Sequence, residues 1–278
     1  MLRLLKSFFL VVSIIATFSV QAQTFKVISF NIRYNPYYQI DGDNCWDNRR
    51  GAVVKMIRDE KPDAIGMQEA LAGQLEYLDR NLSDYRRIGV GRDDGRSEGE
   101  FMAIYYNVNR LELVWHTTRW LSETPRTPSL GWDAACRRTV TIVRFRDRDS
   151  GKEFFYLNTH LDHVGKKARA KSTCQIAALV DSLSAANIPI IVGGDMNSTI
   201  DDPIFQKFYR CGLQDARKMT RRTSNSITYN AFGNDEGAVI DHFFVRGIDV
   251  RRFRTLNGNY GVPYISDHYP IAIRFRLK

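Results

Sequence analysis

The sequence has no Pro-rich or Gly/Ser-rich linker, no low-complexity run and no internal repeat. Such segments mark domain boundaries, disordered tails and repeat proteins, so their absence favours one globular domain. The cysteines form no CxxC pair, and their spacing does not match a structural zinc site. With 278 residues, the chain is long enough to bury one sizeable core.

Long apolar runs are absent after the first 22 residues. Arg3 and Lys6 precede an apolar run over 8–18, and small residues lead to Ala22, which is the pattern of a secretory signal peptide. The run is shorter than the roughly 20 apolar residues of a membrane span, although an uncleaved anchor remains the alternative. No Cys follows the expected cleavage point, which argues against a lipoprotein. We expect a signal peptide at 1–22 and a secreted or periplasmic protein without a stable membrane span after cleavage.

Cysteine is scarce, with four residues in the chain. Export would permit disulfide bonds between them, and four cysteines allow three pairings. Unpaired buried thiols are an equal alternative, and the sequence does not decide between the two. The cysteines are Cys45, Cys136, Cys174 and Cys211.

Acidic residues are fewer than basic ones. The chain has 31 Asp and Glu and 40 Lys and Arg, which gives a formal net charge of +9. A positive field attracts an anionic substrate. Clusters of arginine are usually solvated surface, so charge alone names no substrate.

Apolar periodicity predicts helices over 46–60 and 168–184, with a shorter one that carries Leu75, Leu78 and Leu82. Strands are predicted from alternating or continuous apolar runs. They lie at 25–30, 64–67, 85–90, 101–106, 111–116, 139–145, 153–159, 188–192, 239–245 and 269–277. Because strict βαβ alternation is not kept, we expect an α/β four-layer sandwich of two packed mixed β-sheets flanked by helices over 23–278.

Carboxylate, amide and imidazole side chains stand where several of these strands end. The motifs are Asn31, Gln68-Glu69, Thr159-His160-Leu161, Gly194-Asp195-Met196-Asn197 and Ser266-Asp267-His268. Hard oxygen ligands, a water-activating carboxylate and imidazoles are what metal-assisted attack on phosphorus requires. Each motif alone also fits a turn or a solvated strand end, so the prediction depends on the whole set.

Two acids elsewhere in the sequence are candidates to orient the imidazoles of His160 and His268. A carboxylate partner fixes the tautomer of a histidine and raises its basicity. Asp241 and Glu100 are the two acids. His163 and His242 are weaker candidates, since either fits an ordinary loop or strand position.

The complete ordered set resembles the endonuclease/exonuclease/phosphatase superfamily over nearly all of 23–278. Its members include deoxyribonucleases, abasic-site endonucleases, inositol polyphosphate phosphatases, neutral sphingomyelinases and deadenylases. The motifs are most similar to the deadenylase branch of the carbon-catabolite-repression and nocturnin type. That similarity includes the Trp46-x-x-Arg49 element, the Thr228-Tyr229 pair and the Ile240-Asp241-His242-Phe243 run.

The resemblance implies a role for each motif residue. Glu69 is the principal metal ligand, with Asn31 and Asp267, for Mg²⁺ with Mn²⁺ as a substitute. The catalytic residues are His160, Asp195, Asn197, Asp241 and His268. Within this set Asp195 activates water and Asn197 positions the water or the phosphate. His268 contacts the phosphate and pairs with Asp241, and His160 stabilises phosphate oxygens. Glu100 orients His160, and Arg138, Asn197 and His160 bind the substrate.

We therefore predict a monomeric Mg²⁺-dependent phosphodiester hydrolase, a nuclease acting on single-stranded nucleic acid by in-line attack of water. Ala70 follows Glu69 where some DNA-cutting members carry a basic residue, which weakens the DNA-endonuclease alternative. The main rival is a secreted phosphatase or phosphodiesterase for inositol phosphates or phospholipid head groups. A non-catalytic binding protein is a third alternative. Tryptophans at the rim, Trp46, Trp120 or Trp132, would favour nucleic acid because bases stack on them.

Overall fold

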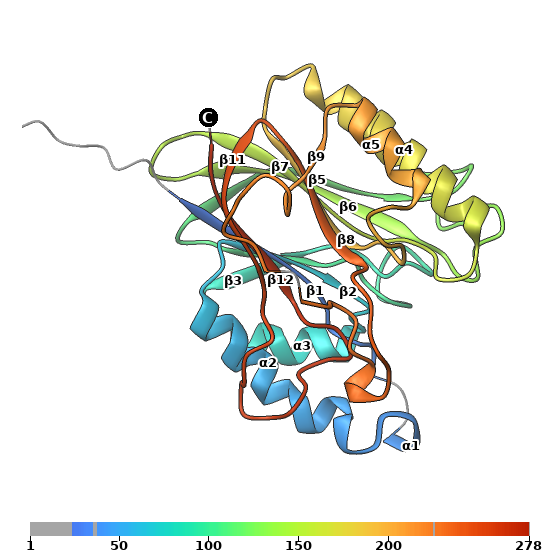
Figure 1. The fold of residues 1–278 in the computed structure, drawn as a ribbon, viewed down its shortest axis with the longest axis vertical. Helices are drawn as coiled ribbons and strands as arrows, with labels where there is room; N and C mark the ends of the chain where they lie inside the picture. The colour runs from blue at the N-terminus through green and yellow to red at the C-terminus, as the bar shows by residue number, and fades with distance from the viewer. Residues whose placement is uncertain (1–23, 36–37, 225, 278) are drawn as a thin grey trace, which may run out of the picture.

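Two six-stranded sheets pack face to face, and helices cover the outer face of each (Figure 1). The computed structural model describes residues 24–35, 38–224 and 226–277. The predicted four-layer α/β sandwich is confirmed. The predicted signal peptide at 1–22 lies outside the described residues.

The first sheet has the strand order β11-β12-β1-β2-β4-β3. Only β1 and β2 pair in parallel, and the other neighbours are antiparallel. Parallel neighbours need a crossover, which helix α2 (Trp46–Glu60) supplies. The bounds are β1 Phe25–Asn31, β2 Ala64–Gln68, β3 Tyr85–Ile88, β4 Ile104–Asn107, β11 Ile248–Thr255 and β12 Ile271–Leu277.

The second sheet has the strand order β5-β6-β7-β8-β10-β9. Here β7 and β8 are the parallel pair, with helix α4 (Lys166–Ser184) as their crossover. The two parallel pairs thus hold the third and fourth places of their sheets. The bounds are β5 Leu111–Trp120, β6 Thr139–Asp147, β7 Glu153–His160, β8 Ile190–Asp195, β9 Gln214–Asp215 and β10 Asp241–Arg246.

Helices α2 and α3 cover the first sheet, and α4 and α5 cover the second (Figure 1). The α-helices are α1 Tyr38–Asp41, α2 Trp46–Glu60, α3 Ala72–Asn81, α4 Lys166–Ser184 and α5 Gln206–Arg210. Short 3₁₀ turns span Gly42–Asn44, Pro203–Phe205 and Ala231–Gly233. No helix in the described part of the chain is long and apolar enough to cross a membrane.

Aromatic rings fill the space between the sheets. Phe25, Phe154 and Phe275 contact one another with ring centroids 5.4 to 5.8 Å apart. Rings of this size bury large apolar areas, so they fix how the two sheets face each other. The four cysteines lie within the described residues and are free thiols, which resolves the alternative left open by the sequence.

Candidate active site

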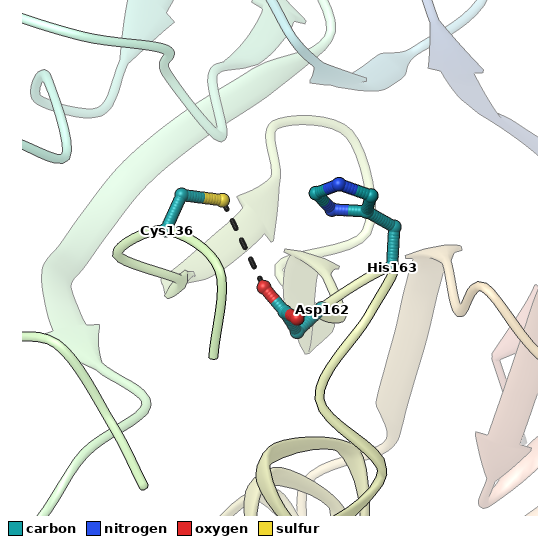
Figure 2. A group of neighbouring side chains, drawn as sticks. All are labelled: Cys136, Asp162 and His163. Carbon is teal, nitrogen blue, oxygen red and sulfur yellow. Dashed lines mark hydrogen bonds between the residues drawn. The ribbon is translucent and has the colours of Figure 1, made fainter. Parts of the chain in front are cut away.

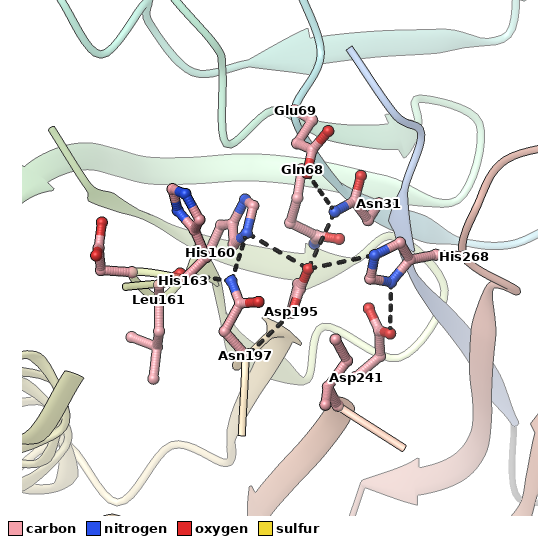
Figure 3. Close-up of polar contacts among 12 residues, drawn as sticks. Asn31, Gln68, Glu69, His160, Leu161, His163, Asp195, Asn197, Asp241 and His268 are labelled. Atoms are coloured by element: carbon pink, nitrogen blue, oxygen red, sulfur yellow. Dashed lines mark hydrogen bonds and ion pairs between the residues drawn. The ribbon is translucent and has the colours of Figure 1, made fainter. Parts of the chain in front are cut away.

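Strand register brings the motif residues to one edge of the sandwich. In the parallel pairs, Asn31 lies opposite Gln68, and His160 lies opposite Asp195. Strand β10 runs the other way and begins at Asp241, which also pairs with Asp195. Because the carboxyl ends of parallel strands share an edge, one site receives residues from both sheets (Figure 3).

A glycine and buried amides make this convergence possible. Gly194 has φ +154, and a Cβ there would lie 1.9 Å from the Thr159 carbonyl oxygen, so only glycine fits. Below the site, Gln68 Nε2 donates to Asn158 Oδ1 at 2.6 Å, and Asn158 Nδ2 donates to the Met67 carbonyl at 2.8 Å. These buried bonds join the two sheets directly beneath the motif residues.

Arg49 anchors the loops on the Asn31 side of the site. Its guanidinium, 1% exposed, donates to the main-chain carbonyls of Ile32 and Ile265, and to that of Arg33 at 2.9 Å. Ile32 follows Asn31, and Ile265 precedes Ser266-Asp267. The arginine of the Trp46-x-x-Arg49 element therefore positions two of the three predicted metal ligands, a role that the sequence did not reveal.

The three predicted metal ligands lie together. Asn31 Nδ2 donates to Glu69 Oε1 at 2.9 Å and to Asp195 Oδ2 at 3.0 Å. Glu69 has φ +63, a strained conformation for a non-glycine residue that is common at functional sites. Burial raises the pKa of Asp267, and the nearby Glu69 adds to the shift. Crowded, partly desolvated oxygen ligands of this kind fit a hard divalent cation.

Asp195 lies at the centre of the site. Its Oδ1 accepts from the Asn197 main-chain N–H at 2.9 Å, and its Oδ2 lies 3.4 Å from His160 Nε2 and 3.6 Å from His268 Nε2 (Figure 3). Burial raises the pKa of Asp195 to about 7, and Asp241 adds to the increase. A carboxyl with a pKa near neutrality is suited to accept a proton from water.

The two predicted histidines have opposite surroundings. His268 Nδ1 bonds Asp241 Oδ2 at 2.9 Å, as predicted. Burial opposes its charge, but Asp241 and Asp195 raise the pKa of His268 to about 10. For His160, burial lowers the pKa well below its usual value, and Arg138 and Arg92 add to this.

Asn197 Nδ2 donates to the Leu161 carbonyl and faces His160 Nε2, each at 2.9 Å. Since this amide group is a donor, Nε2 of His160 acts as the acceptor and its proton lies on Nδ1. Nδ1 is buried and has no hydrogen-bond partner among the described residues.

Glu100 lies in the same pocket but is not bonded to His160 in the described part of the structure. Its carboxylate accepts from Arg92 Nη1 at 2.6 Å instead. Burial raises the pKa of Glu100 to about 7, with a further contribution from Glu69. The predicted Arg138 also lines this pocket of about 520 Å³, together with Arg92, which no sequence motif marks.

Cys136, Asp162 and His163 form a second cluster within metal-ligand distance of one another (Figure 2). The Asp162 oxygens, however, already accept from the main-chain N–H groups of Ala135, Val164 and Gly165. His163 Nδ1 also contacts Arg138, at 2.9 Å. These bonds hold a loop together and leave the cluster poorly suited to a metal ion.

A family model described as "Endonuclease/Exonuclease/phosphatase family" matches residues 28–268. The chain belongs to this family. It is therefore an enzyme of the phosphoric ester hydrolase type, and enzymes of the family typically depend on a divalent metal.

Proteins similar to this chain carry different names. A solved mannosyl-6-phosphatase from Bacteroides thetaiotaomicron is 33% identical, with a TM-score of 0.85, and the match covers 90% of this chain and 99% of that one. The uncharacterized protein L388 of Acanthamoeba polyphaga mimivirus is 26% identical over 90% of this chain and 99% of its own. Nocturnin of Drosophila melanogaster is 24% identical over 60% of this chain and 26% of its own.

The tryptophans do not line the candidate active-site pocket. Trp46 and Trp120 are buried at 3% and 5% exposure, and Trp132 is not among the described residues that line the pocket. The aromatic side chains that line it are Tyr34 and Tyr229. The rim feature expected to favour nucleic acid is therefore not provided by tryptophan.

Proposed function

We propose that this protein is a Mg²⁺-dependent hydrolase of small phosphomonoesters, such as sugar or inositol phosphates. The observation that carries the proposal is Asp195, a buried carboxyl with a pKa of about 7 that lies between two imidazoles at the meeting point of both sheets. A base poised near neutral pH is the group that a water nucleophile needs.

Glu69, Asn31 and Asp267 would hold the cation, and Mn²⁺ fits the same oxygen ligands. When bound, a divalent ion supplies electrostatic stabilisation of a phosphoryl group. In this arrangement Asp195 accepts the proton of the attacking water, and Asn197 keeps that carboxylate oriented through its main-chain N–H.

The imidazoles have different roles in the proposed reaction. His268 is held as a cation by Asp241, so it donates a charged hydrogen bond to a phosphate oxygen. His160 is neutral, and its buried Nδ1–H has no partner among the described residues, which leaves it free to donate. Both donors are fixed before the substrate arrives, which favours the transition state of phosphoryl transfer.

Two observations favour a small substrate. The mannosyl-6-phosphatase of Bacteroides thetaiotaomicron matches nearly its whole length at 33% identity. In addition, the pocket has a volume of about 520 Å³, and Arg92 and Glu100 line it from one loop. Single-stranded nucleic acid is the second candidate, because Tyr34 and Tyr229 offer aromatic faces for stacking.

Export and a monomeric state are further proposals. They are supported by the N-terminal pattern over 1–22 and by the single sandwich domain expected over 23–278.

The test uses purified protein freed of metal with EDTA and then supplied with Mg²⁺ or Mn²⁺. Substrates are p-nitrophenyl phosphate, mannose 6-phosphate, inositol 1-phosphate and labelled single-stranded RNA. We expect metal-dependent phosphate release from the small esters. Glu69→Gln should weaken metal binding at least about 100-fold, beyond the usual loss for an outer-shell residue, while exposed Glu236→Gln should not. Full activity in excess chelator would contradict the proposed metal dependence. Cleavage of RNA without hydrolysis of the small esters would favour the nuclease instead.

A further inference from the structure

Arg138 lines the pocket and has a buried donor without a partner in the described structure. The residue is 4% exposed, and its Nη1 has no hydrogen-bond partner among the described residues. Burying a guanidinium N–H without a partner is costly, and such groups in native structures are rare. An unpaired charged donor that lines a pocket indicates a missing acceptor.

The partners that Arg138 does have leave much of its charge available. Its Nε donates to Asp162 at 3.2 Å, but that carboxylate also accepts three main-chain N–H groups. Its Nη2 contacts His163 Nδ1 at 2.9 Å. Because the guanidinium only donates, Nδ1 must be the acceptor, and the His163 proton lies on Nε2 as a further donor.

Arg92 adds a second guanidinium to the side of the pocket that Arg138 lines, which we call the basic wall. Its Nη1 bonds Glu100, while its Nε is buried without a partner in the described structure. The main chain of Arg92 is held on both sides, because its N–H donates to the Glu100 carbonyl at 3.0 Å and its carbonyl accepts from Trp120 Nε1 at 2.7 Å. The donor is therefore positioned before any ligand binds.

This wall is distinct from the metal-binding end of the pocket. In Figure 3, His163 lies beyond His160, on the side away from His268 and Asp241. Asp241, Asp195 and Asp267 lie near His268 instead. Arg92 and Arg138 also act on His160, whose pKa is lowered by burial and then by these two cations.

We propose that Arg92, Arg138 and His163 form a second anion-binding subsite that recognises an additional phosphate or carboxylate group on the substrate. The subsite rests on the proposed function, since its ligand is a second group of the same phosphoester. An oxyanion fits better than a hydroxyl because the free groups beside it are donors, two of them on cations. The two adjacent carboxylates, Glu100 and Asp162, are already bonded to Arg92 and Arg138.

The experiment compares matched substrates that differ in one anionic group. One arm pairs mannose 6-phosphate with mannose 1,6-bisphosphate, and another pairs glucose 1-phosphate with glucuronic acid 1-phosphate. We expect kcat/KM to be about 10-fold higher for the member with the extra anion, in line with one charged hydrogen bond. The arm with the larger ratio identifies the second group as phosphate or carboxylate.

Arg92→Gln and Arg138→Gln should each reduce that ratio towards one. Arg96→Gln is the matched control, because Arg96 is exposed on the same loop and does not line the pocket. It should keep the wild-type ratio. Circular dichroism checks whether each variant folds. If Arg138→Gln does not fold, Arg92→Gln still tests whether the subsite causes the preference for the extra anion.

Calorimetric binding of the same pairs in EDTA separates failure of the subsite from failure of the proposed function. Tighter binding of the doubly anionic member, lost in Arg92→Gln, would support the subsite even if no substrate were turned over. Equal affinity within both pairs, or a preference that survives in Arg92→Gln and Arg138→Gln, would overturn it.

Discussion

His160 and His268 lie on opposite sides of Asp195 and are both about 4% exposed, yet their pKa values shift in opposite directions. His268 faces Asp241 and Asp195, and its pKa rises to about 10. His160 is close to Arg138 and Arg92, and its pKa falls. Burial disfavours the charged form of both rings, so the charges of the neighbours decide the direction of each shift.

The comparison divides the pocket into an acidic end and a basic end. The acidic end, with Asp241 and Asp267, surrounds His268. The basic end, with Arg92 and Arg138, is built for an anion. A phosphoester bound between the two ends would meet both kinds of partner, and mutations at each end should therefore have separable effects.

The largest effect should come from removing the carboxylate between the two ends. Asp195→Asn keeps the shape but cannot accept a proton, so we expect kcat to fall about 10³-fold. Steady-state kinetics with the best substrate of the panel measures this loss. The matched control is Asp201→Asn, an exposed acid after the same motif, which should retain wild-type kcat. Wild-type turnover by Asp195→Asn would contradict its role as the base.

The next effect should come from the anchor of the acidic end. Arg49→Met leaves the carbonyls of Ile32, Ile265 and Arg33 without their buried donor, so we expect unfolding to require about 3 kcal/mol less free energy. Urea denaturation measures the change. Lys55→Met removes an exposed cation from the same helix and should shift stability by less than about 0.5 kcal/mol. If both variants were equally stable, Arg49 would not be an anchor.

The mildest test changes only pH. In EDTA, NMR titration of the two rings should show His160 neutral at pH 6.5 and His268 still protonated at pH 8. Because the pKa of His268 is higher when folded, its stabilising contribution is complete below about pH 6.5 and lost as pH rises towards 10. For His160 the pKa is lower when folded, so the pH dependence of stability has the opposite sign. Its contribution to stability is present above pH 6.5 and is lost as pH falls below that value. If both rings titrated near pH 6.5, the predicted difference between their pKa values would be wrong.

Much of the fold follows from local pattern. Helix α2 has the predicted bounds, 46–60, because its apolar face repeats regularly and Pro62 follows its end. Strand β11 was missed, because its apolar residues alternate with several arginines and a bulge after Val250 breaks the alternation. An edge strand of this kind carries little of the apolar signal that marks a buried strand.

The site was predictable where its chemistry lies in short motifs. Asp195 and Asp241 converge as expected, because strand register places them opposite one another, and His268 joins them through its bond to Asp241. The partner of Glu100 was not predictable, since its bond to Arg92 depends on how one loop folds back on itself. The unpaired donor of Arg138 is likewise visible only once burial is known.

The two sheets divide the chain in a way that has a practical consequence. All strands of the second sheet come from one continuous segment, 111–246, which enters at the exposed turn around Asn109. A cut at that turn would leave Asn31 and Glu69 on one fragment, and His160 and Asp195 on the other. Neither fragment would hold a complete set of reacting groups. Hydrolysis by the recombined fragments would therefore occur only when they assemble. The two fragments would work as a split enzyme whose activity measures assembly.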